Sequence, residues 1–122
     1  MQKLVWIYHK GKKILHSDHG RFGKDAKTVI LSIETAVQLV KDSGEKEILL
    51  LEDLRNLYVI PEIFNAFKKA GKEMEPYTKK TAEIGLEGSR KIFLSIMNRI
   101  TSLLPKHFET FEEALEWLVD DN

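Results

Sequence analysis

Hydrophobic and polar residues recur with two different periods along the chain, and the change of period predicts where strands and helices lie. The run Leu4–Tyr8 is rich in β-branched and aromatic residues, and Lys10-Gly11 offers a tight turn into a second run, "KKILHSD". These two runs predict an N-terminal β-hairpin. In residues 25–44 apolar side chains recur at near-helical spacing, which predicts a helix with Gly44 as its stop; its apolar positions are Val29, Ile33, Val37 and Val40.

The middle of the chain predicts a buried strand, a helix and a weaker strand. Ile48–Leu51 is a run of consecutive aliphatic residues, as in a strand that is buried on both faces. Pro61 suits the first turn of a helix that Gly71 would close, and the apolar face of this helix comprises Ile63, Phe64, Phe67 and Ala70. The stretch "KKTAEIGL", residues 79–86, is a weaker strand candidate because few of its residues are apolar: Ala82, Ile84 and Leu86.

The clearest helical pattern is "GSRKIFLSIMNRITSLL", residues 88–104, whose apolar stripe is continuous: Ile92, Phe93, Ile96, Met97, Ile100, Leu103 and Leu104. Lys106–Phe108 would then form a short edge strand. Thr110 and Glu113 make a capping box that opens a last helix, with an inward face of Phe111, Ala114, Leu115 and Leu118. A hairpin followed by strands that alternate with helices predicts an α/β fold: a single mixed sheet of four or five strands, parallel in its later part, with about four helices.

Composition narrows the class of protein. The chain has 122 residues, 43% of them hydrophobic and 31% charged, so we expect one globular domain over residues 1–122. Lys and Arg number 19, and so do Asp and Glu, and this zero net charge argues against a nucleic-acid partner. The chain has no cysteine, which excludes disulfides and thiolate chemistry. The first apolar run is too short for a secretion signal or a membrane span, so we expect a cytoplasmic protein.

Two histidines and an aspartate lie close together in "ILHSDHGRFG", residues 14–23, and this raises the question of a metal site. His16, Asp18 and His19 could converge on a metal only if the chain turns sharply after Asp18. The alternative is a solvated strand end followed by a turn, which Asp18 favours through its local hydrogen bonds. We expect the second arrangement and no metal.

Other catalytic patterns are weak. None of the serines lies in the G-x-S-x-G sequence of a nucleophile elbow. Glu52 and Asp53 are adjacent on a predicted strand, which aims their carboxylates at opposite faces of the sheet and makes paired-carboxylate chemistry between them improbable. His107 follows a lysine and is expected at the surface. We therefore expect no catalytic residues and no cofactor.

A ligand or partner would be expected at the carboxyl ends of parallel strands, where the helices begin. One such end is Glu52–Asn56, and another is Leu86–Arg90. At the second end a group of three residues either binds an anion or simply caps the helix: Gly88, Ser89 and Arg90. The connection Leu57–Ile60 is unusually apolar, and either folds back into the core or exposes a patch for a partner or an apolar ligand.

Several phrases together resemble the SpoIIAA-like family of small bacterial proteins: "YHKGKKILHSDHG", "ILLLEDLRN", "AEIGLEGSRKIF" and "FETFEEALEWLV". The most specific is F-x-T-x-E-E-A-x-x-W-L at Phe108–Leu118, and the G-x-x-G turn at Gly85–Gly88 comes second. That family belongs to the STAS domains, which include sulfate-transporter tails and anti-sigma-factor antagonists. It also shares a fold superfamily with CRAL-TRIO lipid-transfer domains. The resemblance covers essentially the whole chain.

The resemblance implies a mixed sheet of four or five strands with helices mainly on one face, no assigned catalytic residues and no recognised metal requirement. It places His19 in a turn where relatives commonly have an aromatic residue. Anti-sigma-factor antagonists carry a phosphorylatable serine in an Asp-Ser-Ser-Gly turn after the third strand. The comparable stretch here, Asp53–Asn56, has no hydroxyl group, which argues against a phosphorylation switch while docking through the same edge stays compatible.

Three functions from different classes are compatible with these patterns. We expect a non-catalytic regulatory or protein-interaction module of the STAS or SpoIIAA-like type, which docks a protein through a crevice formed by Asp53, Arg55, Asn56, Tyr58, Gly85, Gly88, Ser89 and Arg90. The first alternative is a carrier or sensor of a small apolar or anionic ligand, lipid-like or nucleotide-like. The second alternative is a metal-dependent enzyme that uses His16, Asp18 and His19. A homodimer through an exposed strand or helix face is also compatible with the sequence.

Overall fold

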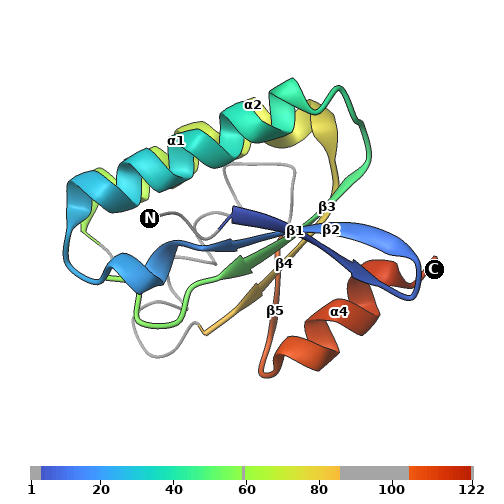
Figure 1. Cartoon of the computed structure of the whole chain (residues 1–122). Coiled ribbons are helices and arrows are strands. Elements are labelled where there is room, and N and C mark those ends of the chain that lie inside the picture. The colour runs from blue at the N-terminus through green and yellow to red at the C-terminus, as the bar shows by residue number, and fades with distance from the viewer. Residues whose placement is uncertain (1–3, 59, 86–104, 122) are drawn as a thin grey trace.

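Five strands form one mixed β-sheet in the computed structural model of the chain, which describes residues 4–58, 60–85 and 105–121 (Figure 1). The strands follow one another across the sheet in chain order. β1 runs antiparallel to β2, and the strands from β2 to β5 are parallel. Their bounds are Leu4–His9 (β1), Lys12–Asp18 (β2), Ile48–Asp53 (β3), Thr78–Ile84 (β4) and Lys106–Phe108 (β5). The predicted α/β class, with an N-terminal hairpin and parallel later strands, is confirmed.

Lys10 and Gly11 form the predicted two-residue turn between β1 and β2. Both have positive φ angles, 50° and 81°, as the type I′ turn of a β-hairpin requires. His9 and Lys12 flank this turn and lie opposite each other. From this pair the register continues along β1 without a shift. The hairpin therefore has a fixed register, in which alternate residues of β1 direct their backbone groups toward β2.

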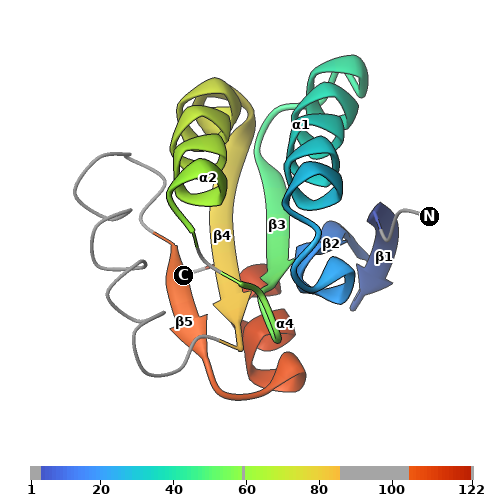
Figure 2. The same cartoon turned by 90° about the vertical axis from the view of Figure 1, so that its left-hand side faces the viewer.

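Three α-helices and two short 3-10 turns accompany the sheet in the described residues. α1 and α2 lie side by side on one face of the sheet, and α4 lies on the opposite face (Figure 1 and Figure 2). The helices are Ala26–Asp42 (α1), Pro61–Met74 (α2) and Phe111–Val119 (α4), and the turns are His19–Phe22 (η1) and Glu75–Tyr77 (η2). The resemblance implied helices mainly on one face, and α4 is the helix that covers the other. The helix predicted in residues 88–104 lies outside the described residues.

The sheet separates two hydrophobic cores because successive residues of a strand point to opposite faces. Leu50 enters the core beneath α1 and α2, together with the predicted inner positions of α1: Val29, Ile33, Val37 and Val40. Leu49 and Leu51 enter the core above α4, together with Ala114, Leu115 and Leu118. β3 is therefore buried along its whole length, as its aliphatic run predicted. α4 begins at the predicted cap, where the backbone N–H of Glu113 donates to Thr110 Oγ1 over 3.1 Å.

Gly71 does not close α2, so this detail of the prediction is wrong. The helix continues to Met74, whose side chain is buried in the core beneath α1 and α2. An additional apolar residue one turn further on therefore keeps the helix against the sheet. Pro76 has no backbone N–H for a further α-helical hydrogen bond, and the chain continues as the short 3-10 turn Glu75–Tyr77.

The apolar connection that precedes α2 folds back for the most part into the core. Leu57 is buried, and Ile60 packs against the core cluster beneath α1 and α2. Tyr58 is different, since 48% of it is exposed. Among the described residues of this connection, Tyr58 is therefore the exposed aromatic side chain. As for membranes, none of the helices in the described ranges has the length and apolar character needed to span one.

Candidate functional site

A row of polar residues crosses the sheet near the carboxyl ends of the parallel strands. In the register of the sheet, Ser17 of β2 lies beside Glu52 of β3, Glu52 beside Glu83 of β4, and Glu83 beside His107 of β5. Paired residues of neighbouring strands direct their side chains to the same face. We call these four residues the polar row. The first three are buried, although polar side chains are seldom buried without a role or a partner.

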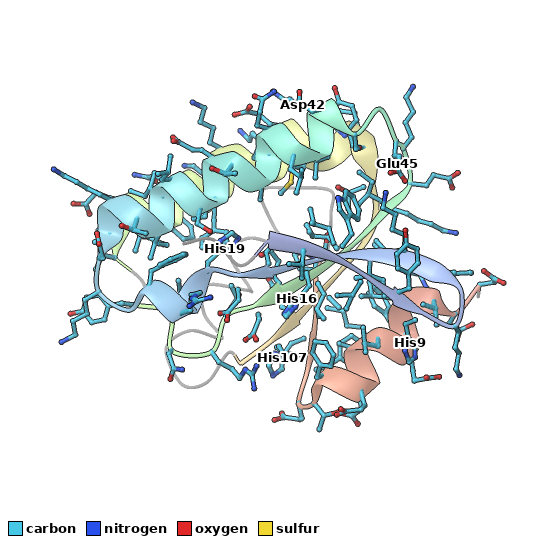
Figure 3. The ribbon with its side chains drawn as sticks, in the orientation of Figure 1. His9, His16, His19, Asp42, Glu45 and His107 are labelled. Carbon is cyan, nitrogen blue, oxygen red and sulfur yellow. The ribbon has the colours of Figure 1, made fainter. Side chains whose placement is uncertain are left out.

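His19 lies at one end of this arrangement, beneath α1 (Figure 3). Its Nδ1 atom is 2.8 Å from the hydroxyl of Ser32 on α1, and its Nε2 atom is 3.1 Å from Glu52 Oε2. The ring also meets the edge of Phe67 on α2, with 5.5 Å between the ring centroids. The strand ends at Asp18 and a turn follows, as expected, but His19 is only 1% exposed, so the expectation that this stretch is solvated is wrong for His19. The η1 turn folds the chain back over the end of the sheet and brings the ring under the helices.

Glu52 and Glu83 form a buried pair of carboxyl groups. Burial raises the pKa of Glu83 to about 8, and the negative charge of Glu52 adds to this effect. Glu83 is therefore protonated near neutral pH, and its carboxyl group carries no charge there. Several buried oxygens here have no hydrogen-bond partner among the residues that the structure describes: Ser17 Oγ, Thr81 Oγ1 and Glu83 Oε1. Glu52 Oε2 has the close contact with His19 Nε2 but no hydrogen bond of good geometry.

A cavity of about 30 Å³ lies beside this pair, lined in part by His19, Glu52, Thr81 and Glu83. A space of that size holds a water molecule, which makes about three hydrogen bonds with buried polar groups. It does not hold a substrate. His19 and Ser32 are each 1% exposed, so their contact does not present a nucleophile to an external molecule. The carboxyl group of Glu83 can hold a proton here. In the described residues, however, no opening leads from this group to a reactant.

Asp53 carries a second polar cluster on the opposite face of the sheet. The guanidinium of Arg55 donates to both of its oxygens, from Nε over 2.9 Å and from Nη2 over 2.6 Å. His16 Nε2 lies 3.8 Å from Asp53 Oδ2, and its ring packs edge-on against Phe111 of α4. Burial alone would raise the pKa of Asp53, but His16 and Arg55 outweigh burial and hold this pKa well below its usual value.

The metal-site hypothesis depends on whether His16 and His19 lie on the same face of the β-sheet. His19 lies under α1 and α2, whereas His16 lies on the side of α4 (Figure 3). The sheet separates the two imidazoles, so the hypothesis that His16, Asp18 and His19 converge on one ion is wrong. No group of three or more histidine, aspartate or glutamate side chains in the described part of the chain is arranged to hold a metal ion. The prediction that Glu52 and Asp53 face opposite ways is confirmed.

The loop that follows β3 passes through a narrow gap between two glycines. A Cβ atom on Gly20 would lie 1.9 Å from the carbonyl oxygen of Arg55, and one on Gly85 would lie 2.4 Å from Arg55 Cγ. The backbone N–H of Leu54 donates to the carbonyl of Ile84 over 2.9 Å. Asn56 adopts a positive φ of 65°, a conformation that asparagine tolerates better than most residues. Steric contact and hydrogen bonding therefore hold this loop in one conformation.

Exposed polar side chains surround the loop and form a surface that we call the β3 rim: Arg21, Lys24, Arg55, Asn56 and Tyr58. The side chain of Arg55 is 64% exposed although Asp53 holds its guanidinium. The ammonium of Lys24 lies 5.2 Å from the centre of the Tyr58 ring. Within the β3 rim is an open hollow of about 190 Å³, lined by Asp18, Arg21, Asp53, Arg55 and Asn56.

The structure thus brings together five of the predicted site residues at one end of the sheet: Asp53, Arg55, Asn56, Tyr58 and Gly85. Gly88, Ser89 and Arg90 lie outside the described residues. Sequence reasoning missed the polar row and Ser32. His107 was expected at the surface, but both of its ring nitrogens are buried and have no hydrogen-bond partner in the ranges the structure describes. The sequence feature that could have indicated the polar row was Glu83, a charged residue between Ala82 and Ile84 in a predicted strand.

No model of a known protein family matches the chain, and no curated protein matches it either.

Proposed function

We propose that the protein is a non-catalytic protein-binding module of the SpoIIAA-like type, which works in the cytoplasm and docks its partner on the β3 rim. The observation that carries this proposal is the buried carboxylate of Asp53, which fixes an exposed arginine from below. Two short hydrogen bonds hold the guanidinium of Arg55 in one orientation before any partner arrives. Preorganised side chains lose less conformational entropy on binding, which favours affinity.

The composition of the β3 rim suits a protein better than a small molecule. Arginine and tyrosine are the residue types that most often dominate the energy of protein interfaces, and Arg55 and Tyr58 are both exposed here. The hollow of about 190 Å³ is smaller than the roughly 300–1,000 Å³ of ordinary ligand pockets, and it is open and charged rather than apolar. A side chain of a partner fits such a hollow. This size and charge favour docking of a protein over carriage of a lipid or a nucleotide.

The charge of the β3 rim indicates the chemistry of the partner. Arg21, Lys24 and Arg55 are exposed cations on this surface. Asp53, by contrast, is buried beneath Arg55, and Asp18, in the wall of the hollow, is half-buried. A complementary surface therefore carries carboxylates around a small apolar contact for Tyr58. The loop from Asp53 to Leu57 contains no hydroxyl group, so docking on the β3 rim needs no phosphorylation of this loop.

Position-specific crosslinking tests this function. We expect a photoreactive amino acid at Tyr58, used in a lysate of the source cells, to give one dominant adduct through an acidic peptide of the partner. The same amino acid at Leu31 on α1, which is similarly exposed at 57%, is the matched control and should give none. Arg55→Gln keeps a donor for Asp53 but removes the charge, and should lower the yield at position 58 about tenfold or more.

Two results would count against the proposal. The first is an adduct pattern that is the same at positions 58 and 31, which would show that the contact does not depend on the β3 rim. The second is an undiminished yield from Arg55→Gln protein whose far-ultraviolet circular dichroism matches that of the wild type. Either result would remove Arg55 and its surroundings from the docking surface.

A further inference from the structure

β1 is an edge strand without the features that usually protect such edges. It lies at one end of the sheet, and its described partner is β2 alone. Natural sheets commonly protect their edges with short strands, lysine, proline or bulges, because free backbone groups otherwise recruit another strand. The opposite edge, β5, follows this rule, since it has three residues and begins with Lys106. β1 has six residues, "LVWIYH", with no lysine, proline or bulge.

The hairpin register identifies which backbone groups of β1 point away from the sheet. In a hairpin with a two-residue turn, the pair next to the turn exchanges hydrogen bonds, and such pairs alternate along the ladder. His9 is next to the turn, so His9, Ile7 and Val5 bond to β2. The N–H and C=O groups of Tyr8, Trp6 and Leu4 therefore point outward along the free edge.

We propose that two copies of this chain associate through antiparallel pairing of β1 with β1, centred on Trp6. In this register Trp6 lies opposite Trp6 of the second copy, and Leu4 lies opposite its Tyr8. Every outward N–H and C=O of these three residues then meets a complementary group. A register centred on Ile7 would leave the backbone groups of Leu4 opposite the turn. Of these two registers, the one centred on Trp6 therefore pairs all the outward backbone groups of Leu4, Trp6 and Tyr8.

The properties of β1 favour a second copy over an unrelated strand. Antiparallel pairing about a central residue is self-complementary, as a two-fold interface requires. The side chains that come into contact are apolar: Val5 would face Ile7 of the second copy, and such aliphatic cross-strand pairs stabilise sheets. Val5 is 44% exposed and Tyr8 is 69% exposed, so the pairing would cover apolar surface on both faces.

Charge does not oppose the approach of a second copy. His9 and Lys10, next to the turn, each lie 2.7 Å from an oxygen of Glu116 on α4, so the charge of Lys10 is compensated within its own chain. The formal net charge of the whole chain is zero, which leaves little long-range repulsion between copies. The residues that pair with each other, 4–8 of the two copies, have no charged side chain, so like charges do not meet between them.

The geometry of the pair leaves the β3 rim free. Because Trp6 of each copy lies on the same face of the joined sheet, the two-fold axis is perpendicular to the sheet. The parallel strands of the two copies then run in opposite directions, and the two β3 rims lie at opposite ends of the dimer. The dimer does not depend on the proposed docking function. Its small contact area makes it reversible and dependent on concentration.

Sedimentation velocity between about 1 μM and about 500 μM tests this dimer. We expect the wild-type protein to shift from monomer to dimer across this range. Tyr8→Pro removes an outward N–H without removing a bond to β2, and should raise the concentration at the midpoint about tenfold or more. Tyr8→Thr keeps the N–H and introduces a β-branched side chain that suits a strand, and should change the midpoint less than about threefold.

Amide hydrogen exchange of the wild type provides a test that does not depend on whether Tyr8→Pro folds. The amides of Trp6 and Tyr8 should exchange fast in dilute protein and about tenfold or more slowly in concentrated protein. A wild-type protein that is monomeric at the highest concentration would overturn the proposal. Dimerisation of folded Tyr8→Pro protein at the same midpoint as Tyr8→Thr, or amides of Trp6 and Tyr8 that exchange equally fast in dilute and concentrated protein, would overturn it as well.

Discussion

Glu83→Gln is expected to stabilise the protein at neutral and alkaline pH and to remove most of the dependence of its stability on pH between about 4.5 and about 8. In the unfolded chain Glu83 releases its proton near pH 4.5, whereas burial and the charge of Glu52 raise its pKa to about 8 in the folded protein. The folded state therefore binds one proton more than the unfolded state between these two values. A group of this kind lowers the free energy of unfolding progressively as the pH rises from its unfolded pKa through its folded pKa.

The expected size of this effect is large for a single group. Each unit of pKa difference corresponds to about 1.4 kcal/mol, so full ionisation of Glu83 costs roughly 3–5 kcal/mol above about pH 8. Glutamine has the shape of the protonated acid and can also donate a hydrogen bond, but it cannot ionise. Urea unfolding at several pH values from about 5 to about 9 measures the difference between the two proteins.

An exposed glutamate provides the control for this experiment. Glu62→Gln in the first turn of α2 removes the same charge at the surface and should leave the dependence of unfolding on pH unchanged, within about 0.5 kcal/mol. If Glu83→Gln retained the full pH dependence of the wild type, the account of Glu83 as a buried proton store would be wrong. The same conclusion would follow if the substitution destabilised the protein above about pH 8.

Gly20→Ala is expected to destabilise the protein by about 3 kcal/mol or more. The new methyl group would lie 1.9 Å from the carbonyl oxygen of Arg55, a separation that no relaxation of a side chain can relieve, because the atom it meets is backbone. The loop after β3 must therefore move, and the β3 rim moves with it. Thermal or urea unfolding measures the loss of stability.

The control for this glycine is Gly44→Ala. Gly44 has a positive φ of 70° but open space around its Cβ position, so alanine there incurs only the backbone cost of about 1 kcal/mol. The difference between the two variants isolates the close approach at Gly20. Equal losses of stability in the two variants would show that the loop after β3 is not held tightly by Gly20.

Local patterns in the sequence were sufficient to predict most of the fold. The turn at Lys10-Gly11, the buried run of β3 and the capping box at Thr110 each depend on neighbours in the chain, and the structure confirms all three. Gly71 shows the limit of this reasoning. The burial of Met74 in the core, three residues further on, stabilises the helix beyond Gly71. A glycine in the sequence therefore does not by itself end a helix.

The buried polar cluster could not be predicted in the same way because it depends on the register of parallel strands. Glu52 and Glu83 are far apart in the sequence, and a register shifted by one residue would direct Glu83 to the other face. The burial of His19 depends likewise on the η1 turn, which folds its ring onto Ser32 and Phe67. The alternation along one strand was predictable, so Glu52 and Asp53 were placed correctly on opposite faces.

The central claim is that an acidic protein partner docks on the β3 rim, and amide hydrogen exchange of the isolated protein and of the complex trapped at position 58 tests it most directly. The predicted result is that exchange of the loop amides of Arg21, Arg55 and Asn56 slows by about tenfold or more in the complex, while the exposed edge of β1 keeps its rate. Unchanged exchange at these three residues, with protection on the exposed surfaces of α1 and α2 instead, would contradict the claim.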